Sequence, residues 1–159
     1  MAMSIRFQVL DNTGPLSQQT EYLARHTTQA CAEYVRDHIR REMAKPKSGK
    51  RYRIRGTDVW YTASRPGEYP AIRTSVLAQH IEIYTPESTR VMRGAAAPWP
   101  RGDSIVAFLG TDVPYAKYLE GEDPPGSGLR PFLNRAAHEV APDLQPLAES
   151  LFRPGSWSL

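Results

Sequence analysis

The residue types that most often carry chemistry are few in this chain and widely spaced. It has 159 residues with four histidines and one cysteine, and none of these lies near a second ligand at the spacings that metal sites use. They are His26, His38, His80, His138 and Cys31. We therefore expect no metal site and no cofactor, and we expect each of the five residues to have a structural role.

Known catalytic motifs are also missing. Gly49-Lys50 has the Gly-Lys pair of a phosphate-binding loop, but no glycine stands five residues before Gly49, and Arg51 follows where Ser or Thr is required. No Gly-x-Ser-x-Gly elbow is present to expose a nucleophile. Arg101-Gly102-Asp103 spells an adhesion tripeptide, which occurs often by chance. We therefore predict no catalytic residues and a protein that is not an enzyme.

A basic segment over residues 45–65 is the feature with a functional alternative. Residues 51–55 and 59–63 have the composition of two strands of a hairpin, and we expect aromatic and aliphatic side chains on one face and arginines on the other. Asp58 is the one acidic residue of the segment. Its positive residues are Lys45, Lys47, Lys50, Arg51, Arg53, Arg55 and Arg65.

Three interpretations of this basic segment remain open. Cations interleaved with an aromatic residue such as Tyr52 could follow a phosphate backbone, which would make the protein a small nucleic-acid-binding module. The plain alternative is a solvated strand face. The third is contact between copies of the chain, because residues 101–126 carry a net charge of about −3 that could meet the basic segment of a neighbour. Its acidic residues include Glu120, Glu122 and Asp123.

The hydrophobic pattern predicts the elements that position these residues. Residues 4–10 alternate with the period of a strand, and residues 17–44 have apolar positions at the three- and four-residue steps of one long helix. Ser17 suits the N-cap of this helix, and Pro46 prevents its continuation. A continuous apolar run at 104–110 predicts a buried central strand.

Shorter elements and loops complete this prediction. We expect a helical turn at 76–77, a strand at 80–84 and a short helix at 114–119. Residues 131–140 begin a last helix, which Pro142 kinks or restarts. The irregular segments between these elements are residues 64–75, 86–103 and 120–128.

Composition and charge fit one ordered domain. The chain is 40% hydrophobic and 23% charged, with a net charge of +3, which is too small to name a partner. We expect a single α+β domain over residues 1–153, followed by a C-terminal tail at 154–159: a small, mostly antiparallel sheet packed by one long N-terminal helix and a C-terminal helix, with long loops. No signal peptide or membrane span is apparent, so we expect synthesis in a cytoplasm and no membrane partner.

The order of several short motifs resembles the tail-completion, or head–tail joining, neck proteins of long-tailed bacteriophages. The similarity covers about residues 17–152, and Ser75 and Pro142 depart from the family pattern. Its motifs are Pro46-x-Ser48-Gly49, Ala63-Ser64-Arg65-Pro66-Gly67-Glu68-Tyr69-Pro70-Ala71, Thr74-Ser75-x-Leu77, Leu109-Gly110-Thr111-x-x-Pro114-Tyr115-Ala116-x-x-Leu119-Glu120 and Arg130-Pro131-Phe132-Leu133.

This resemblance implies a structural protein of the virion neck, made in the host cytoplasm. It implies a homo-oligomeric ring of about six copies around the channel through which DNA leaves the head, with a head-closure or connector protein on one side and a tail terminator or tail tube protein on the other. DNA would pass through the lumen. A tail terminator that stops growth of the tube is the near alternative.

The loop at 65–71 is our expected contact with a neighbouring ring. Pro66, Gly67 and Pro70 stiffen it, which lowers the entropy lost on docking. Glu68 offers a charge and Tyr69 an amphipathic anchor at its tip. The other expected contacts are the basic residues Lys50, Arg51, Arg53, Arg55 and Arg65, and the acidic residues Glu120, Glu122 and Asp123.

Overall fold

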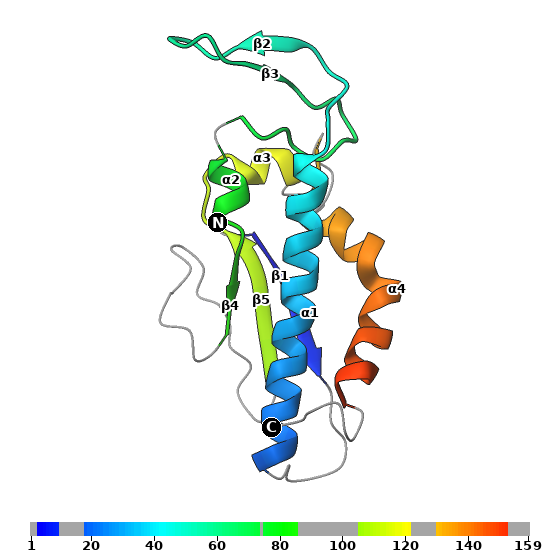
Figure 1. Ribbon diagram of the computed structural model, residues 1–159. Coiled ribbons are helices and arrows are strands. Elements are labelled where there is room, and N and C mark those ends of the chain that lie inside the picture. The colour runs from blue at the N-terminus through cyan, green and yellow to red at the C-terminus, as the bar shows by residue number, and fades with distance from the viewer. Residues whose placement is uncertain (1–2, 10–17, 74, 86–104, 122–129, 153–159) are drawn as a thin grey trace.

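The computed structural model describes residues 3–9, 18–73, 75–85, 105–121 and 130–152, and shows an α+β fold with two small antiparallel sheets (Figure 1). The helices and strands, in chain order, are β1 Met3–Val9, α1 Gln18–Ala44, β2 Arg51–Arg53, β3 Trp60–Thr62, α2 Val76–Gln79, β4 Glu82–Tyr84, β5 Ile105–Thr111, α3 Ala116–Glu120 and α4 Leu133–Phe152. The predicted fold class is confirmed.

The larger sheet has the strand order β1-β5-β4, and both pairs are antiparallel. All seven residues of β5 are buried, as the apolar run of the sequence predicted for a strand with neighbours on both sides. β1 pairs with β5 along its whole length, from Met3 opposite Thr111 to Val9 opposite Ile105. The sheet therefore joins the first strand of the chain to one that follows about a hundred residues later.

Helix α1 lies across one face of this sheet, and α4 lies beside α1 (Figure 1). The buried side of α1 includes Val35, Ile39 and Met43, which pack in one cluster with Leu109 of β5 and Phe132 just before α4. α1 ends at Ala44, in front of Lys45-Pro46, where proline prevents the next helical hydrogen bond. The predicted long helix is confirmed, and the predicted N-cap at residue 17 lies outside the described residues.

Helix α4 does not restart at Pro142. It continues over 20 residues with both Pro142 and Pro146 inside it. Both prolines are exposed, so the carbonyl groups that lose a helical donor can bond to water, while the first half of the helix is held by the buried Ala136 and Val140. Burial of one side therefore outweighs the local preference of proline to end a helix.

Ser75 has an unusual backbone conformation. Ser75 precedes α2 with φ 61° and ψ −10°, the left-handed region, and its side chain makes no capping hydrogen bond. This conformation costs an L residue roughly 1–2 kcal/mol and costs glycine almost nothing. The turn into α2 is thus formed by serine in a backbone geometry that suits glycine.

Candidate interaction surfaces at the hairpin end

The hairpin of β2 and β3 leaves the body of the molecule at one end, beyond the end of α1 (Figure 1). We call residues 50–62 the arm. Its pairing begins where the Gly49 N–H donates to the Ala63 carbonyl at 2.9 Å and continues to Ile54 N–H on the Val59 carbonyl at 2.8 Å. Gly49 is needed at this root, because a Cβ there would overlap the carbonyl oxygen of Ala63. The predicted hairpin is confirmed.

The two faces of the arm are not divided as the sequence predicted. Tyr52 and Tyr61 are cross-strand partners on one face, with ring centroids 5.9 Å apart. Arg53 is opposite Trp60, and the guanidinium of Arg51 lies 5.4 Å from the Trp60 ring centre, so an aromatic ring shares the arginine face. The expected separation of aromatic residues from arginines is wrong, because the register of the hairpin pairs Trp60 with an arginine.

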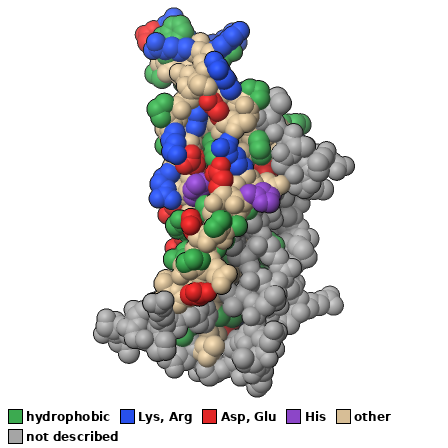
Figure 2. All heavy atoms as spheres, turned by 90° about the vertical axis from the view of Figure 1, so that its right-hand side faces the viewer, with side chains coloured by type: hydrophobic (Ala, Val, Ile, Leu, Met, Phe, Trp, Pro, Cys, Tyr) green, Lys and Arg blue, Asp and Glu red, His purple; other side chains and the backbone are tan. Residues whose placement is uncertain are grey.

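Positive side chains gather on the arm (Figure 2). Arg53 is held by Asp58 and by the Thr57 carbonyl oxygen at 2.7 Å. Lys50 and Arg55 are exposed and have no polar partner among the described residues, and Arg51 has only the Trp60 ring. Three cations of the arm are therefore available to an external partner.

Lys45 and Lys47 belong to the body instead. The Lys45 ammonium lies 2.5 Å from the Glu42 carboxylate, and the Lys47 ammonium donates to the Glu42 carbonyl at 2.7 Å. Both side chains turn back on the last turn of α1, where positive charge is favoured by the helix dipole. They stabilise the end of α1 rather than extend the basic surface of the arm.

Glu68 ties the loop at 64–70 to the root of the arm. Its carboxylate accepts the Ser48 hydroxyl and the backbone N–H of Arg65, the latter at 2.8 Å. These hydrogen bonds, that from Ser48 first, lower the pKa of Glu68 below its ordinary value. Glu68 was expected as a free charge on a contact loop, but it is half-buried and acts as a brace within the chain.

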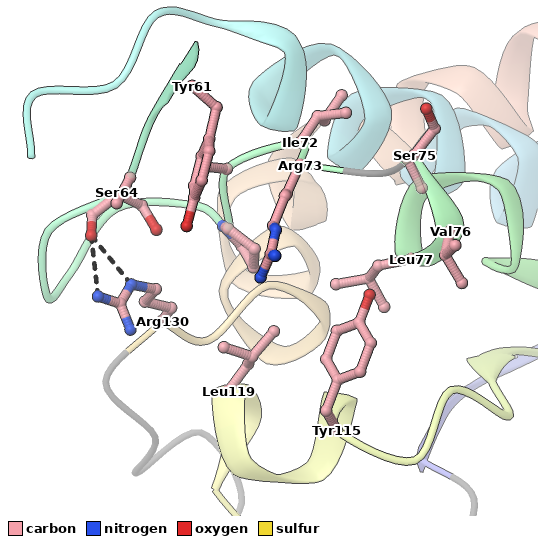
Figure 3. A pocket seen from close by; sticks show the side chains of 14 residues that line it. Tyr61, Ser64, Ile72, Arg73, Ser75, Val76, Leu77, Tyr115, Leu119 and Arg130 are labelled. Atoms are coloured by element: carbon pink, nitrogen blue, oxygen red, sulfur yellow. Dashed lines mark hydrogen bonds between the residues drawn. The ribbon is translucent and has the colours of Figure 1, made fainter. Parts of the chain in front are cut away.

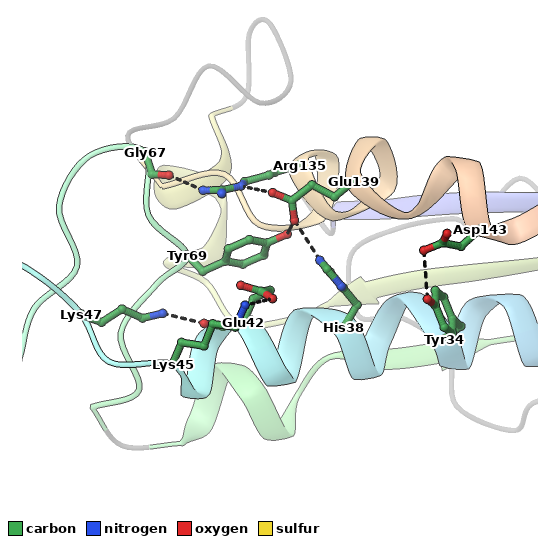
Figure 4. A network of polar contacts seen from close by, with 10 residues as sticks. All are labelled: Tyr34, His38, Glu42, Lys45, Lys47, Gly67, Tyr69, Arg135, Glu139 and Asp143. Carbon is green, nitrogen blue, oxygen red and sulfur yellow. Dashed lines mark hydrogen bonds and ion pairs between the residues drawn. The ribbon is translucent and has the colours of Figure 1, made fainter.

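Tyr69 is buried, with 3% of its surface exposed, so its expected position at the tip of a contact loop is wrong. Its hydroxyl donates to the Glu139 carboxylate at 2.7 Å, and the Arg135 guanidinium lies 4.6 Å from its ring centre (Figure 4). His38 bonds to the same carboxylate at 2.9 Å, and Arg135 donates to it at 2.7 Å. One carboxylate on α4 therefore joins α1 and the loop.

This network changes the pKa values of both acidic members. Burial alone would raise the pKa of Glu139, but the hydrogen bonds from Arg135, His38 and Tyr69 outweigh it and lower the pKa to about 2. Burial and the hydrogen bond to Glu139 raise the pKa of the Tyr69 hydroxyl well above its usual range. At neutral pH the ionised carboxylate therefore faces a protonated phenol.

The rest of the loop is divided between surface and core. Arg65, Pro66 and Gly67 are exposed, although the Gly67 carbonyl accepts a hydrogen bond from Arg135. Pro70 is buried and does not lie on the exposed surface of the loop. The first three residues of the expected contact thus remain on the surface.

Glu120 is also buried, at 1% exposure, and is not part of an acidic surface. Its carboxylate accepts the backbone N–H groups of Phe132, Leu133 and Asn134 at 2.7, 2.9 and 2.8 Å. It therefore caps the N-terminus of α4, where the first N–H groups have no partner in the helix. The other predicted acidic contacts, at positions 122 and 123, lie outside the described residues.

A pocket of about 430 Å³ opens at the root of the arm (Figure 3). Arg130 donates twice to the Ser64 carbonyl at 2.9 and 3.1 Å and forms one wall, and the guanidinium of Arg73 lies 5.7 Å from the Tyr61 ring centre. The rim is apolar and exposed: Ile72 is 38%, Val76 39% and Tyr115 45% exposed. Next to Tyr115, the side chain of Tyr118 is 74% exposed.

Sequence reasoning missed this pocket. The residues that form its wall come from four separate segments. The only local signal in the sequence was a pair of apolar residues, at positions 72 and 76, close to a proline-rich stretch. Several pocket residues stand in the short motifs that the sequence analysis singled out: Ser64, Pro70, Ala71, Leu77, Tyr115, Leu119 and Arg130. Those motifs meet in space at the root of the arm.

The described histidines and the cysteine do not form a metal site. His38 bonds to Glu139, His80 lies 3.3 Å from Asp112, and burial raises the pKa of the Cys31 thiol. Within the described part of the chain, no three His, Cys, Asp or Glu side chains are placed to hold a metal ion. None of its helices has the length and apolar character that crossing a membrane requires.

Comparison with family models, with curated proteins and with solved structures found no match.

Proposed function

We propose that this protein is a structural, non-enzymatic component of a virion neck that joins a DNA-filled head to a tail. In this role it assembles as a ring of about six copies between a head-closure or connector protein and a tail terminator or tail tube protein. The observation that carries the proposal is apolar surface at one end of the molecule that the described chain does not cover. It comprises Val59 and Trp60 on the arm, Ile72, Val76 and Tyr115 at the pocket, and Tyr118 on α3.

The position of this surface suits assembly. Trp60 and Val59, 52% and 56% exposed, lie on an arm that stands away from the body, whereas the pocket rim lies on the body itself. Contacts between two different patches of one chain are head-to-tail, and such contacts close into a ring when the rotation permits. Aromatic residues at a pocket are also the type that most often anchors a protein interface.

The resemblance supplies the second support. The motifs that resemble those of neck proteins come from separate parts of the sequence, yet many of their residues line the pocket or brace its wall. Residues such as Glu68, Tyr69 and Glu120 hold this end of the molecule in shape. We therefore interpret the motifs as the residues that build one surface at this end of the molecule, and not as a single loop that contacts the partner directly.

The native mass of the purified protein tests the assembly. We expect a discrete ring near six copies, and we expect the double variant Val76→Ser, Tyr115→Ser to form smaller species because it removes apolar contact area at the rim. Tyr22→Ser is the control. Tyr22 is 57% exposed near the start of α1, whereas the arm follows the end of α1, so this substitution should leave the ring intact. A monomer at every protein concentration, with connector protein present, would contradict the proposal.

Deletion of the gene in its phage tests the role. The expected product is DNA-filled heads and complete tails that do not join. Tails of abnormal length would identify a tail terminator instead, and intact infectious particles would contradict both roles.

A further inference from the structure

We infer that the arm is a binding site for duplex DNA that contacts the phosphate backbone through Lys50, Arg51 and Arg55. This inference concerns a ligand that the neck proposal does not require, and it would hold equally for the protein outside a ring. It rests on how the cations of the arm differ from those of the body.

Most cations of the body are engaged within the chain. Arg25 and Arg36 pair with carboxylates, Arg40 donates to two backbone carbonyls, and Arg130 and Arg135 brace the pocket and the loop. Among the described residues, Arg53 is the one cation of the arm with such a partner. The side chains of Lys50, Arg51 and Arg55 have no polar partner among the described residues, and Arg51 contacts only the Trp60 ring. They form a local excess of three positive charges on a segment with one acidic residue, Asp58, which already pairs with Arg53.

The shape of the arm favours duplex over single-stranded nucleic acid. A two-stranded ribbon has the dimensions that the major groove of a duplex accepts, and this ribbon stands clear of the body (Figure 1). Binding of a single strand depends on free aromatic platforms along a groove. Here Tyr52 and Tyr61 lie against each other, and Trp60 already has Arg51 over its ring. The cations, rather than the rings, are the groups left for a ligand.

The affinity should therefore depend on salt and not on sequence. Each phosphate neutralised on a duplex contributes about −0.9 to the slope of log affinity against log salt, so three contacts give a slope of roughly −3 for each engaged arm. Phosphate contacts position a protein on DNA without reading its bases, so two duplexes of unrelated sequence should bind alike.

Fluorescence anisotropy with a labelled 24-base-pair duplex, and with one of its strands, tests this inference on the full chain. The triple variant Lys50→Gln, Arg51→Gln, Arg55→Gln should bind the duplex roughly tenfold or more weakly at 0.1 M salt, with a shallower slope. Arg25→Gln, Arg36→Gln, Arg41→Gln is the charge-matched control, because these residues lie on α1, and it should bind like the wild type. Arg51→Lys, Arg55→Lys keeps the charge and should keep the affinity.

Three results would overturn the inference: equal affinity of the arm variant and the wild type, wild-type affinity that does not change with salt, or a single strand bound more tightly than the duplex and lost with Trp60→Ala. Native mass is measured on the same samples. A ring that does not bind DNA contradicts only this inference. A protein that binds DNA through the arm but stays monomeric with connector protein present contradicts only the neck proposal.

Discussion

At the scale of single residues, two carboxylates have structural roles that the neighbouring sequence does not indicate. Glu120 stands at the start of an acidic, loop-like segment, so the sequence suggested a surface charge. Its partners are backbone N–H groups 12 to 14 residues later. The Glu139 carboxylate accepts a hydrogen bond from the hydroxyl of Tyr69, 70 positions earlier. Roles set by such distant partners have no local pattern, which is why the predicted contact residues included Tyr69 and Glu120.

The network around Glu139 predicts a pH dependence of stability. Its carboxyl has a pKa of about 2 in the folded protein against 4.5 ordinarily, so the stability that it contributes is complete above about pH 4.5 and is lost as the pH falls towards 2. We expect Glu139→Gln to be less stable at neutral pH and to lose less further stability over this interval than the wild type. Urea unfolding at several pH values measures both.

Glu149→Gln is the control for that experiment. Glu149 is exposed on the same helix and accepts one hydrogen bond, from Gln145. It should keep the acid sensitivity of the wild type. If the free energy of unfolding fell equally with pH in the wild type and in Glu139→Gln, ionisation of Glu139 would not stabilise the fold.

At the scale of elements, period and apolar runs predicted most of the structure correctly. α1 and β5 follow from the spacing of apolar residues, and the end of α1 follows from Pro46. α4 was the exception, because its prolines favoured a break and only tertiary burial keeps it continuous. The pocket could not be predicted, because its walls belong to segments that are brought together by Arg130 and by the packing of α2 and α3.

The start of α4 should depend on its buried cap. In Glu120→Gln one acceptor becomes an amide donor that faces the N–H groups of residues 132–134, so the free energy of unfolding should fall by about 1–3 kcal/mol. Denaturant unfolding measures the change. Glu33→Gln replaces a carboxylate in mid-α1 that accepts a single side-chain bond and should change stability by less than about 0.5 kcal/mol. Equal effects of the two substitutions would show that the Glu120 cap does not stabilise the fold.

At the scale of the whole molecule, the arm and the body are separable. The core cluster comes from the four helices, the larger sheet and the loops between them, and no residue of the arm belongs to it. We expect replacement of residues 50–62 by an Asn-Gly turn between Gly49 and Ala63 to leave a folded body, with a thermal midpoint within a few degrees of the wild type. The same variant should no longer bind duplex DNA. Calorimetry that shows an unfolded chain would contradict this separation.

The root of the arm also determines where a mechanical load would be carried. Its first strand continues from the end of α1, and its second enters the loop that Glu68 ties to Ser48 and Arg135 ties to α4. A force on the tip is therefore delivered to two neighbouring helices and bypasses the pairing of β1, β5 and β4. The larger sheet would receive this force only through the α1 and α4 side chains that pack on it.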